Sequence, residues 1–110
     1  MAAQQQDRTV LRDRPKKSKP KKRQISPPSK YAVVLYNDNY TPMDFVVFVL
    51  QEIFNHPFER AERIMLAVHT DGMGIAGIYN FEIAEQKATE CHELAVEHEY
   101  ALKLNVEEIT

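Results

Sequence analysis

Several features are missing from this sequence of 110 residues. It has a single cysteine, Cys91, so no disulfide can form within the chain. It has no apolar run of the roughly 20 residues that a membrane helix needs, and no apolar stretch near its N-terminus of the kind found in secretory signals. We therefore expect a cytoplasmic protein that does not enter a membrane.

Motifs for catalysis are missing as well. The sequence contains no glycine-rich phosphate loop, no zinc-protease helix motif and no G-x-S-x-G elbow. The four histidines show no i, i+4 pair, so a metal site would need ligands from separate elements. Cys91 falls on the apolar stripe of a predicted helix and His92 on another face, which favours a buried structural thiol over a nucleophile. The sequence thus predicts no enzyme, no metal site and no cofactor.

Charge is distributed very unevenly along the chain. Residues 1–30 hold ten Lys/Arg and two Asp/Glu, a net +8, whereas residues 31–110 hold four and fourteen, a net −10. Residues 14–23 are strongly basic, poor in apolar side chains and interrupted by Pro15 and Pro20. We predict a flexible basic arm over residues 1–30 and one folded domain over residues 31–110.

The same charge distribution bears on nucleic-acid binding. An acidic domain offers no surface for a phosphate backbone, so such binding is not expected of residues 31–110. A nucleic-acid or ribosome-associated function that acts through the arm is the alternative left open.

Apolar periodicity in residues 31–110 predicts the order strand, helix, helix, strand, helix, strand. Thr41 is expected to cap the first helix, with Pro42 at its first position, and Asn80 to cap the third. The buried stripe of the third helix is expected at Ala84, Ala88, Cys91, Leu94 and Ala95. We place strands over residues 31–36, 74–79 and 100–106, and helices over residues 42–55, 59–69 and 81–98.

The first predicted helix is apolar around most of its circumference. Its expected core stripe comprises Met43, Val46, Val47, Leu50, Ile53 and Phe54, and Phe45, Phe48 and Val49 widen it further. One interpretation is burial on two sides, by a sheet and by the second helix. The other is that the start of this helix, near Met43 and Val46, lines an open apolar pocket.

Polar residues lie next to this helix start in the predicted fold. Asn37 and Asp38 belong to a turn, while Met65 and His69 share one face of the second helix. Taken singly, the turn residues are ordinary and His69 is a favourable partner for the helix dipole. Together they suit a ligand with a cationic amine beside a large apolar group.

The string YAVVLYNDNYTPMDFVVFVLQEIF, followed by ERAERIMLAVH and GIAGIYNFEIAEQKA, closely resembles the ClpS family of protease adaptors. The resemblance covers nearly all of residues 31–107. It implies an α/β (α+β) fold in which a three-stranded antiparallel sheet packs on three helices, similar to the C-terminal domain of the ribosomal stalk protein. It also implies a non-enzymatic adaptor that binds proteins with a free N-terminal Leu, Phe, Tyr or Trp and delivers them to a Clp ATPase.

The resemblance also implies roles for individual residues. Asn37 and His69 would hydrogen-bond the free α-amino group, with assistance from Asp38. Met43 would act as a gate against β-branched residues. The apolar side chain would enter a pocket formed by Asn39, Thr41, Met43, Val46, Met65, Val68 and Leu102.

Two further positions match the family surface that docks on the N-terminal domain of the Clp ATPase, ClpA or ClpC: Glu82 and Lys87. Without the family they would be taken as ordinary charges on a solvated helix face. The sequence departs from the family at Asn39, where a second aspartate is common, and at Tyr100-Ala101-Leu102, where His-Pro-Leu is common. We therefore expect side-chain preference to differ from the family norm while amine capture is retained. The family also offers a use for the arm, as a segment that the ATPase engages during delivery.

Overall fold

The computed structural model describes residues 29–109, so the predicted arm lies almost entirely outside the described residues. The predicted order of elements is confirmed. None of the helices among the described residues combines the length and the apolar composition that crossing a bilayer requires. The elements are β1 (Lys30–Tyr36), α1 (Met43–Glu52), α2 (Phe58–Asp71), β2 (Met73–Tyr79), α3 (Phe81–Glu97) and β3 (Lys103–Ile109).

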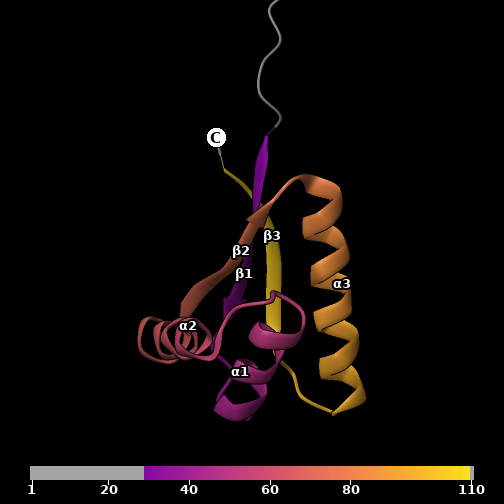
Figure 1. The fold of residues 1–110 in the computed structure, drawn as a ribbon. Coiled ribbons are helices and arrows are strands. Elements are labelled where there is room, and N and C mark those ends of the chain that lie inside the picture. The colour runs from indigo at the N-terminus through magenta and orange to yellow at the C-terminus, as the bar shows by residue number, and fades with distance from the viewer. Residues whose placement is uncertain (1–28, 110) are drawn as a thin grey trace, which may run out of the picture.

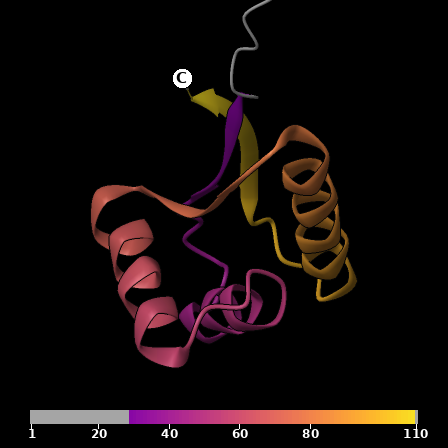
Figure 2. The same cartoon turned by 45° about the horizontal axis from the view of Figure 1, so that its top comes forward.

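The three strands form one antiparallel sheet in the order β2-β1-β3. In the registers, Leu35 of β1 lies opposite Gly74 of β2 and opposite Leu104 of β3. The helices gather on one side of this sheet, with α2 beside β2, α3 beside β3 and α1 at the end where β1 finishes (Figures 1 and 2). The predicted fold class, a three-stranded antiparallel sheet packed on three helices, is confirmed.

The core lies between the helices and the near face of the sheet. Val33 and Leu35 of β1 are fully buried there, because the central strand has neighbours on both edges. The stripe predicted for α3 is buried at Ala84, Ala88, Cys91 and Ala95, whereas Leu94 is only half-buried. The small alanine side chains let α3 lie close to the sheet.

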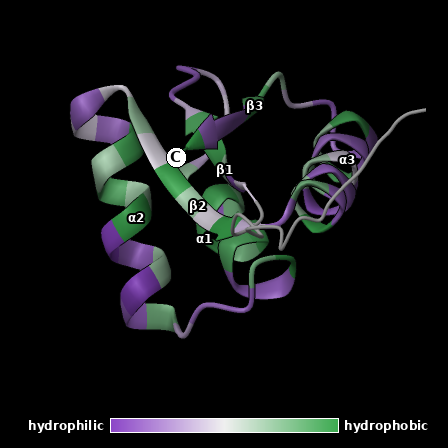
Figure 3. Ribbon diagram, turned by 90° about the horizontal axis from the view of Figure 1, so that it is seen from above, coloured by the Kyte–Doolittle hydropathy of each residue, from purple (hydrophilic) through white to green (hydrophobic). Residues whose placement is uncertain are grey.

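The predicted core stripe of α1 is partly wrong. Phe45, Val46, Val49 and Leu50 are buried, whereas Met43 is 46% exposed. Figure 3 shows that α1 is predominantly hydrophobic, whereas α2 and α3 each carry both kinds of residue. The helix can be apolar around most of its surface because α2 packs on one side and the Tyr100 ring, 4.8 Å from that of Phe45, covers another.

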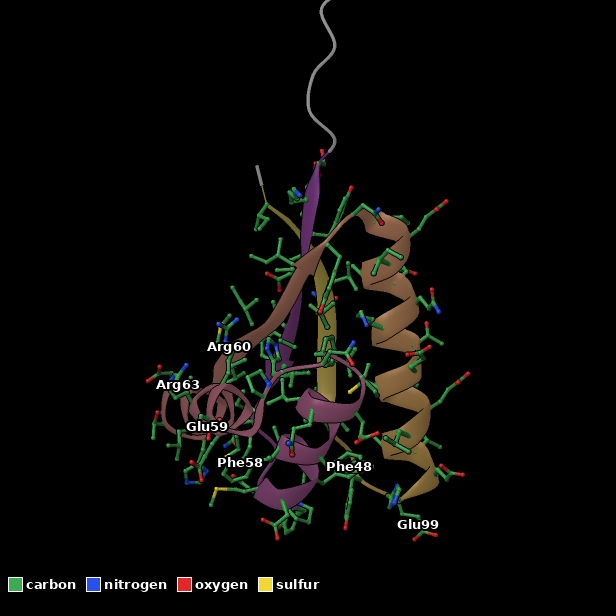
Figure 4. All side chains as sticks on the ribbon, viewed as in Figure 1. Phe48, Phe58, Glu59, Arg60, Arg63 and Glu99 are labelled. Carbon is green, nitrogen blue, oxygen red and sulfur yellow. The ribbon has the colours of Figure 1, made fainter. Side chains whose placement is uncertain are left out.

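Some of this apolar surface is not covered. Phe48 of α1 and Phe58 at the start of α2 project away from the core and are about half exposed (Figure 4).

Two element ends differ from the prediction because non-glycine residues adopt positive φ. α1 ends at Glu52, and Asn55 at φ 59° then redirects the chain before Pro57. α3 ends at Glu97, and Glu99 at φ 63° allows the Tyr100 N–H to donate to the Ala95 carbonyl at 2.8 Å. The segment 100–102 is therefore a connection, and β3 starts at Lys103.

Candidate functional site

A pocket of about 280 Å³ opens where β1 ends and α1 begins. It is assembled from the turn after β1, the first turns of α1, the last turns of α2 and the connection before β3. The lining residues are Tyr36, Asn37, Asp38, Asn39, Thr41, Pro42, Met43, Val46, Met65, Val68, His69 and Leu102. All ten residues nominated from the sequence as one binding site therefore line a single pocket.

Two residues of the lining, Tyr36 and Pro42, were missed by the sequence analysis. Both directly adjoin nominated residues in the sequence, which was the only signal available. The Tyr36 hydroxyl donates to Glu107 Oε2 at 2.7 Å, and this hydrogen bond raises the pKa of the Tyr36 phenol. Tyr36 therefore links the wall of the pocket to β3.

Backbone hydrogen bonds hold the polar turn beside the end of α2. Gly72, at φ 89°, ends α2 in the left-handed conformation that glycine adopts without strain, and its N–H donates to the Val68 carbonyl at 3.1 Å. The Asn37 N–H donates to the Gly72 carbonyl at 2.9 Å. Asn37 and His69, which are 32 positions apart in the sequence, therefore lie at the same rim of the pocket.

Thr41 has a different role from the one predicted. The N-cap of α1 is Pro42, without a side-chain cap hydrogen bond, so the prediction that Thr41 caps the helix is wrong. The Thr41 hydroxyl instead donates to Asp38 Oδ2 at 2.7 Å, and the Thr41 N–H donates to the Asp38 carbonyl at 3.2 Å. Thr41 is only 8% exposed, and a buried hydroxyl is stabilised when its hydrogen bond is made. The bond fixes the orientation of the Asp38 carboxylate at the pocket.

The floor of the pocket is apolar. Val46, Met65, Val68 and Leu102 are each at most 9% exposed, and they come from α1, α2 and the connection before β3. Met43 lies at the start of α1 with nearly half of its surface exposed, so its long side chain can move. The arrangement is an apolar hollow with an amide, a carboxylate and an imidazole among its lining residues.

The other two nominated residues, Glu82 and Lys87, lie on α3 and outside this pocket. Asn80 caps α3 as predicted, since its side chain accepts a hydrogen bond from the Ile83 N–H at 3.0 Å. Glu82 is exposed in the first turn of α3, at the end of the sheet opposite the pocket (Figure 1).

Lys87 is not a freely solvated charge. Its Nζ donates to the Ile53 carbonyl at 2.7 Å and lies 5.5 Å from the centroid of the Tyr79 ring. The Ile53 carbonyl follows the end of α1, where backbone oxygens lack helical partners. Lys87 therefore ties α3 to the end of α1 and is half-buried.

Groups with other reactive potential are held in structural positions. Cys91 is buried as predicted, and burial raises the pKa of its thiol to about 12. His56 contacts the Ala76 carbonyl, and His98 stacks on Tyr100. Among residues 29–109, no three His, Cys, Asp or Glu side chains are placed to hold a metal ion.

A model of the family described as "ATP-dependent Clp protease adaptor protein ClpS" matches residues 26–105, which is most of the chain. The chain belongs to the ClpS family. ClpS proteins are adaptors of a Clp protease, so the function of this family member is not enzymatic.

Curated relatives agree with this assignment. The ClpS protein of Xanthomonas campestris is 46% identical over 87 residues, which cover 79% of this chain and 82% of the relative. The ClpS protein of Hyphomonas neptunium is 50% identical over 80 residues, which cover 73% of this chain and 68% of the relative. Among solved structures, Agrobacterium tumefaciens ClpS2 bound to L-phenylalaninamide is similar with a TM-score of 0.73 and 34% identity, over 76% of this chain and all of that one.

Proposed function

We propose that the pocket binds the first residue of substrate proteins that carry a free α-amino group and a Leu, Phe, Tyr or Trp side chain. The chain would then deliver these proteins to a Clp ATPase for degradation. The observation that carries this proposal is the composition of the pocket, in which Asn37, Asp38 and His69 adjoin an apolar floor. It is also supported by the similar ClpS2 structure, whose ligand L-phenylalaninamide combines a free amine with a benzyl side chain.

Recognition of the amine requires acceptors for its N–H groups. A protonated α-amino group presents three donors and no acceptor, as a Lys ammonium does. Asn37 and His69 are proposed to accept two of its hydrogen bonds, and Asp38 to supply the opposite charge. Since the Thr41 hydroxyl already bonds to Oδ2 of Asp38, the ligand amine or its first peptide group would meet Oδ1.

The apolar floor would hold the side chain of the first residue. The volume of about 280 Å³ is larger than the ~150 Å³ cavity that suffices for a benzene molecule in an engineered protein core. Burial of a Leu or Phe side chain there contributes roughly 1.5–3 kcal/mol. Asn39 and Thr41 are proposed to contact the ligand at the pocket wall, beside Val46, Met65, Val68 and Leu102.

Met43 is proposed to select against β-branched first residues. It stands at the start of α1 where a ligand Cβ would pass, and a branched Cβ would collide with its side chain. The side-chain preference is proposed to depart from the family norm for two reasons. Asn39 stands where a second aspartate is common, which removes a carboxylate from the mouth of the pocket. Tyr100-Ala101 stands where His-Pro is common, which changes the wall around Leu102.

Delivery is proposed to use surfaces away from the pocket. The partner would be the N-terminal domain of ClpA or ClpC in the cytoplasm, with Glu82 as a docking contact. Lys87 would contribute through its hold on the end of α1 as much as by direct contact, given its bond to Ile53. Residues 31–110 are proposed to be the adaptor domain and residues 1–30 an arm that the ATPase engages.

A reconstituted degradation assay tests this function. A folded reporter that begins with Phe should be degraded by the Clp ATPase and its peptidase only when this chain is added. A matched reporter that begins with Gly should be unaffected, and excess free L-phenylalaninamide should inhibit the first reaction. Equal stimulation of both reporters would refute recognition of the first residue.

A further inference from the structure

A second hollow, of about 550 Å³, lies on α3 away from the binding pocket. Its floor is apolar and half-exposed, and three carboxylates stand around it. The lining residues are Ile53, Leu94 and Val96, with Glu90, Glu93 and Glu97. Val96 is 59% exposed and adds apolar surface to this hollow.

Of the three carboxylates of this groove, only Glu90 has a Lys or Arg within four positions on α3, namely Lys87. After Lys87, α3 contains no Lys or Arg, and Lys87 already donates to the Ile53 carbonyl. Glu93 and Glu97 are four positions apart, which places like charges side by side. Glu97 also lies in the last helical turn, where the partial negative charge of the helix end repels it.

This arrangement is electrostatically unfavourable by itself, and a cationic segment would relieve it. In Figure 4 side chains with oxygen tips project from α3 away from the sheet, and Glu99 lies just beyond the end of the helix.

A segment of matching chemistry exists within the chain. Residues 14–23 contain seven Lys/Arg and no Asp/Glu. Lysine side chains can also lay their methylene stems along apolar surface while their ammonium groups meet carboxylates, which matches an apolar floor with an acidic rim. Pro15 and Pro20 supply further apolar surface without an N–H group that would need a partner.

The segment is attached close enough to reach the groove. β1 begins beside the start of α3, since the rings of Tyr31 and Phe81 are 5.0 Å apart and both elements start at the same end of the molecule (Figure 1). A helix rises about 1.5 Å per residue, so Glu93 lies roughly 18 Å along α3 from Phe81. An extended chain covers up to about 3.3 Å per residue, so Arg23 can lie up to ~23 Å and Lys16 up to ~46 Å from Lys30.

We propose that the basic segment 14–23 of this chain docks in the acidic groove of α3 formed by Ile53, Leu94 and Val96 with Glu90, Glu93 and Glu97. The tether makes the contact intramolecular, with an effective concentration in the millimolar range, so even a contact of about millimolar affinity is formed roughly half of the time. A partner that needs this segment must then compete with the groove for it. The proposal is independent of what the pocket binds.

Paramagnetic relaxation in the full chain tests the docking. Cys91 is buried, so a nitroxide label added to native Ser18→Cys protein reacts at position 18 alone. We expect about a twofold or larger loss of amide peak intensity over residues 88–99, with α2 unaffected. The loss should fade when the salt concentration is raised from about 0.05 M to about 1 M, because the screening length falls to about 3 Å.

Two charge-reversal variants provide the matched comparison. Glu93→Lys with Glu97→Lys should abolish the intensity loss, whereas Glu59→Lys with Glu62→Lys on exposed positions of α2 should preserve it. Mixing labelled unenriched chain with unlabelled ¹⁵N chain separates docking within one molecule from docking between two. Equal effects of both variants, a loss spread evenly over the surface, or a loss only in the mixed sample would each overturn the proposal.

Discussion

Replacing Thr41 by valine separates its hydrogen bond to Asp38 from the packing of its side chain. Valine has nearly the shape of threonine, so no cavity forms at this position, which is only 8% exposed. The variant loses one hydrogen bond of 2.7 Å to a carboxylate. Such bonds contribute about 1.5–3 kcal/mol, and we expect the lower end because Asp38 is half-buried and water can replace part of the bond.

If the lost hydrogen bond destabilises only the peptide-bound state, affinity for a Phe-first peptide should fall about tenfold. The assay is fluorescence anisotropy with a peptide labelled at its C-terminus, so that the α-amino group stays free. Thr41→Ser keeps the hydroxyl and loses one methyl group, worth about 0.8 kcal/mol, and is the matched control. Thermal unfolding of each variant measures the part of the loss that falls on the fold instead.

A double-mutant cycle with Asp38→Ala tests whether Thr41 acts through Asp38. In that background the acceptor is absent, so Thr41→Val should weaken peptide binding no further. If the loss of affinity in the double variant equals the sum of the losses in the two single variants, the view that Thr41 orients Asp38 is refuted.

Further substitutions and measurements test separate parts of the account. Met43→Ala should admit Val-first and Ile-first peptides while Phe-first binding persists, measured by the same anisotropy; an unchanged ratio of affinities would exclude a gate. Glu82→Ala should weaken ATPase binding, measured by surface plasmon resonance, without a change in melting temperature. Lys87→Ala should weaken ATPase binding and also lower the free energy of unfolding by about 1–2 kcal/mol, because its bond to Ile53 is lost. Identical melting temperatures of the Lys87→Ala variant and the unchanged protein would contradict this role. Cys91 should resist alkylation at about pH 8 until the chain is denatured. Because folding raises the pKa of this thiol from 9.0 to about 12, its contribution to stability is complete below pH 9.0 and lost as the pH rises toward 12, relative to Cys91→Ala.

The sequence predicted the order of the elements because period-two and helical patterns alternate clearly between residues 31 and 106. It misplaced the end of α1 and the start of β3, since Asn55 and Glu99 adopt positive φ without the glycine that usually signals it. The sequence did predict correctly which residues of β3 face the core, since Leu104 and Val106 pack against it as the alternation indicated.

The sequence alone suggested an apolar pocket at the start of α1 beside a polar turn, but the full set of lining residues came only from the family resemblance. Periodicity pairs Met65 with His69 within α2, but nothing local places them beside Asn37, which depends on the bond from Asn37 to Gly72. Thr41 could have capped α1 or bonded Asp38, since both choices are local, and the fold decided between them. The bond from Lys87 to Ile53 spans 34 positions and could be seen only in three dimensions.

The central claim is that the pocket recognises a free α-amino group beside a bulky side chain. The most direct measurement compares two peptides of identical sequence beginning with Phe, one free and one N-acetylated, both labelled at the C-terminus. The free peptide should bind in the micromolar range or better, about −8 kcal/mol, and the acetylated one should show no measurable binding, because it has lost its charge and two N–H donors. Equal affinity for the two peptides would contradict the proposed function.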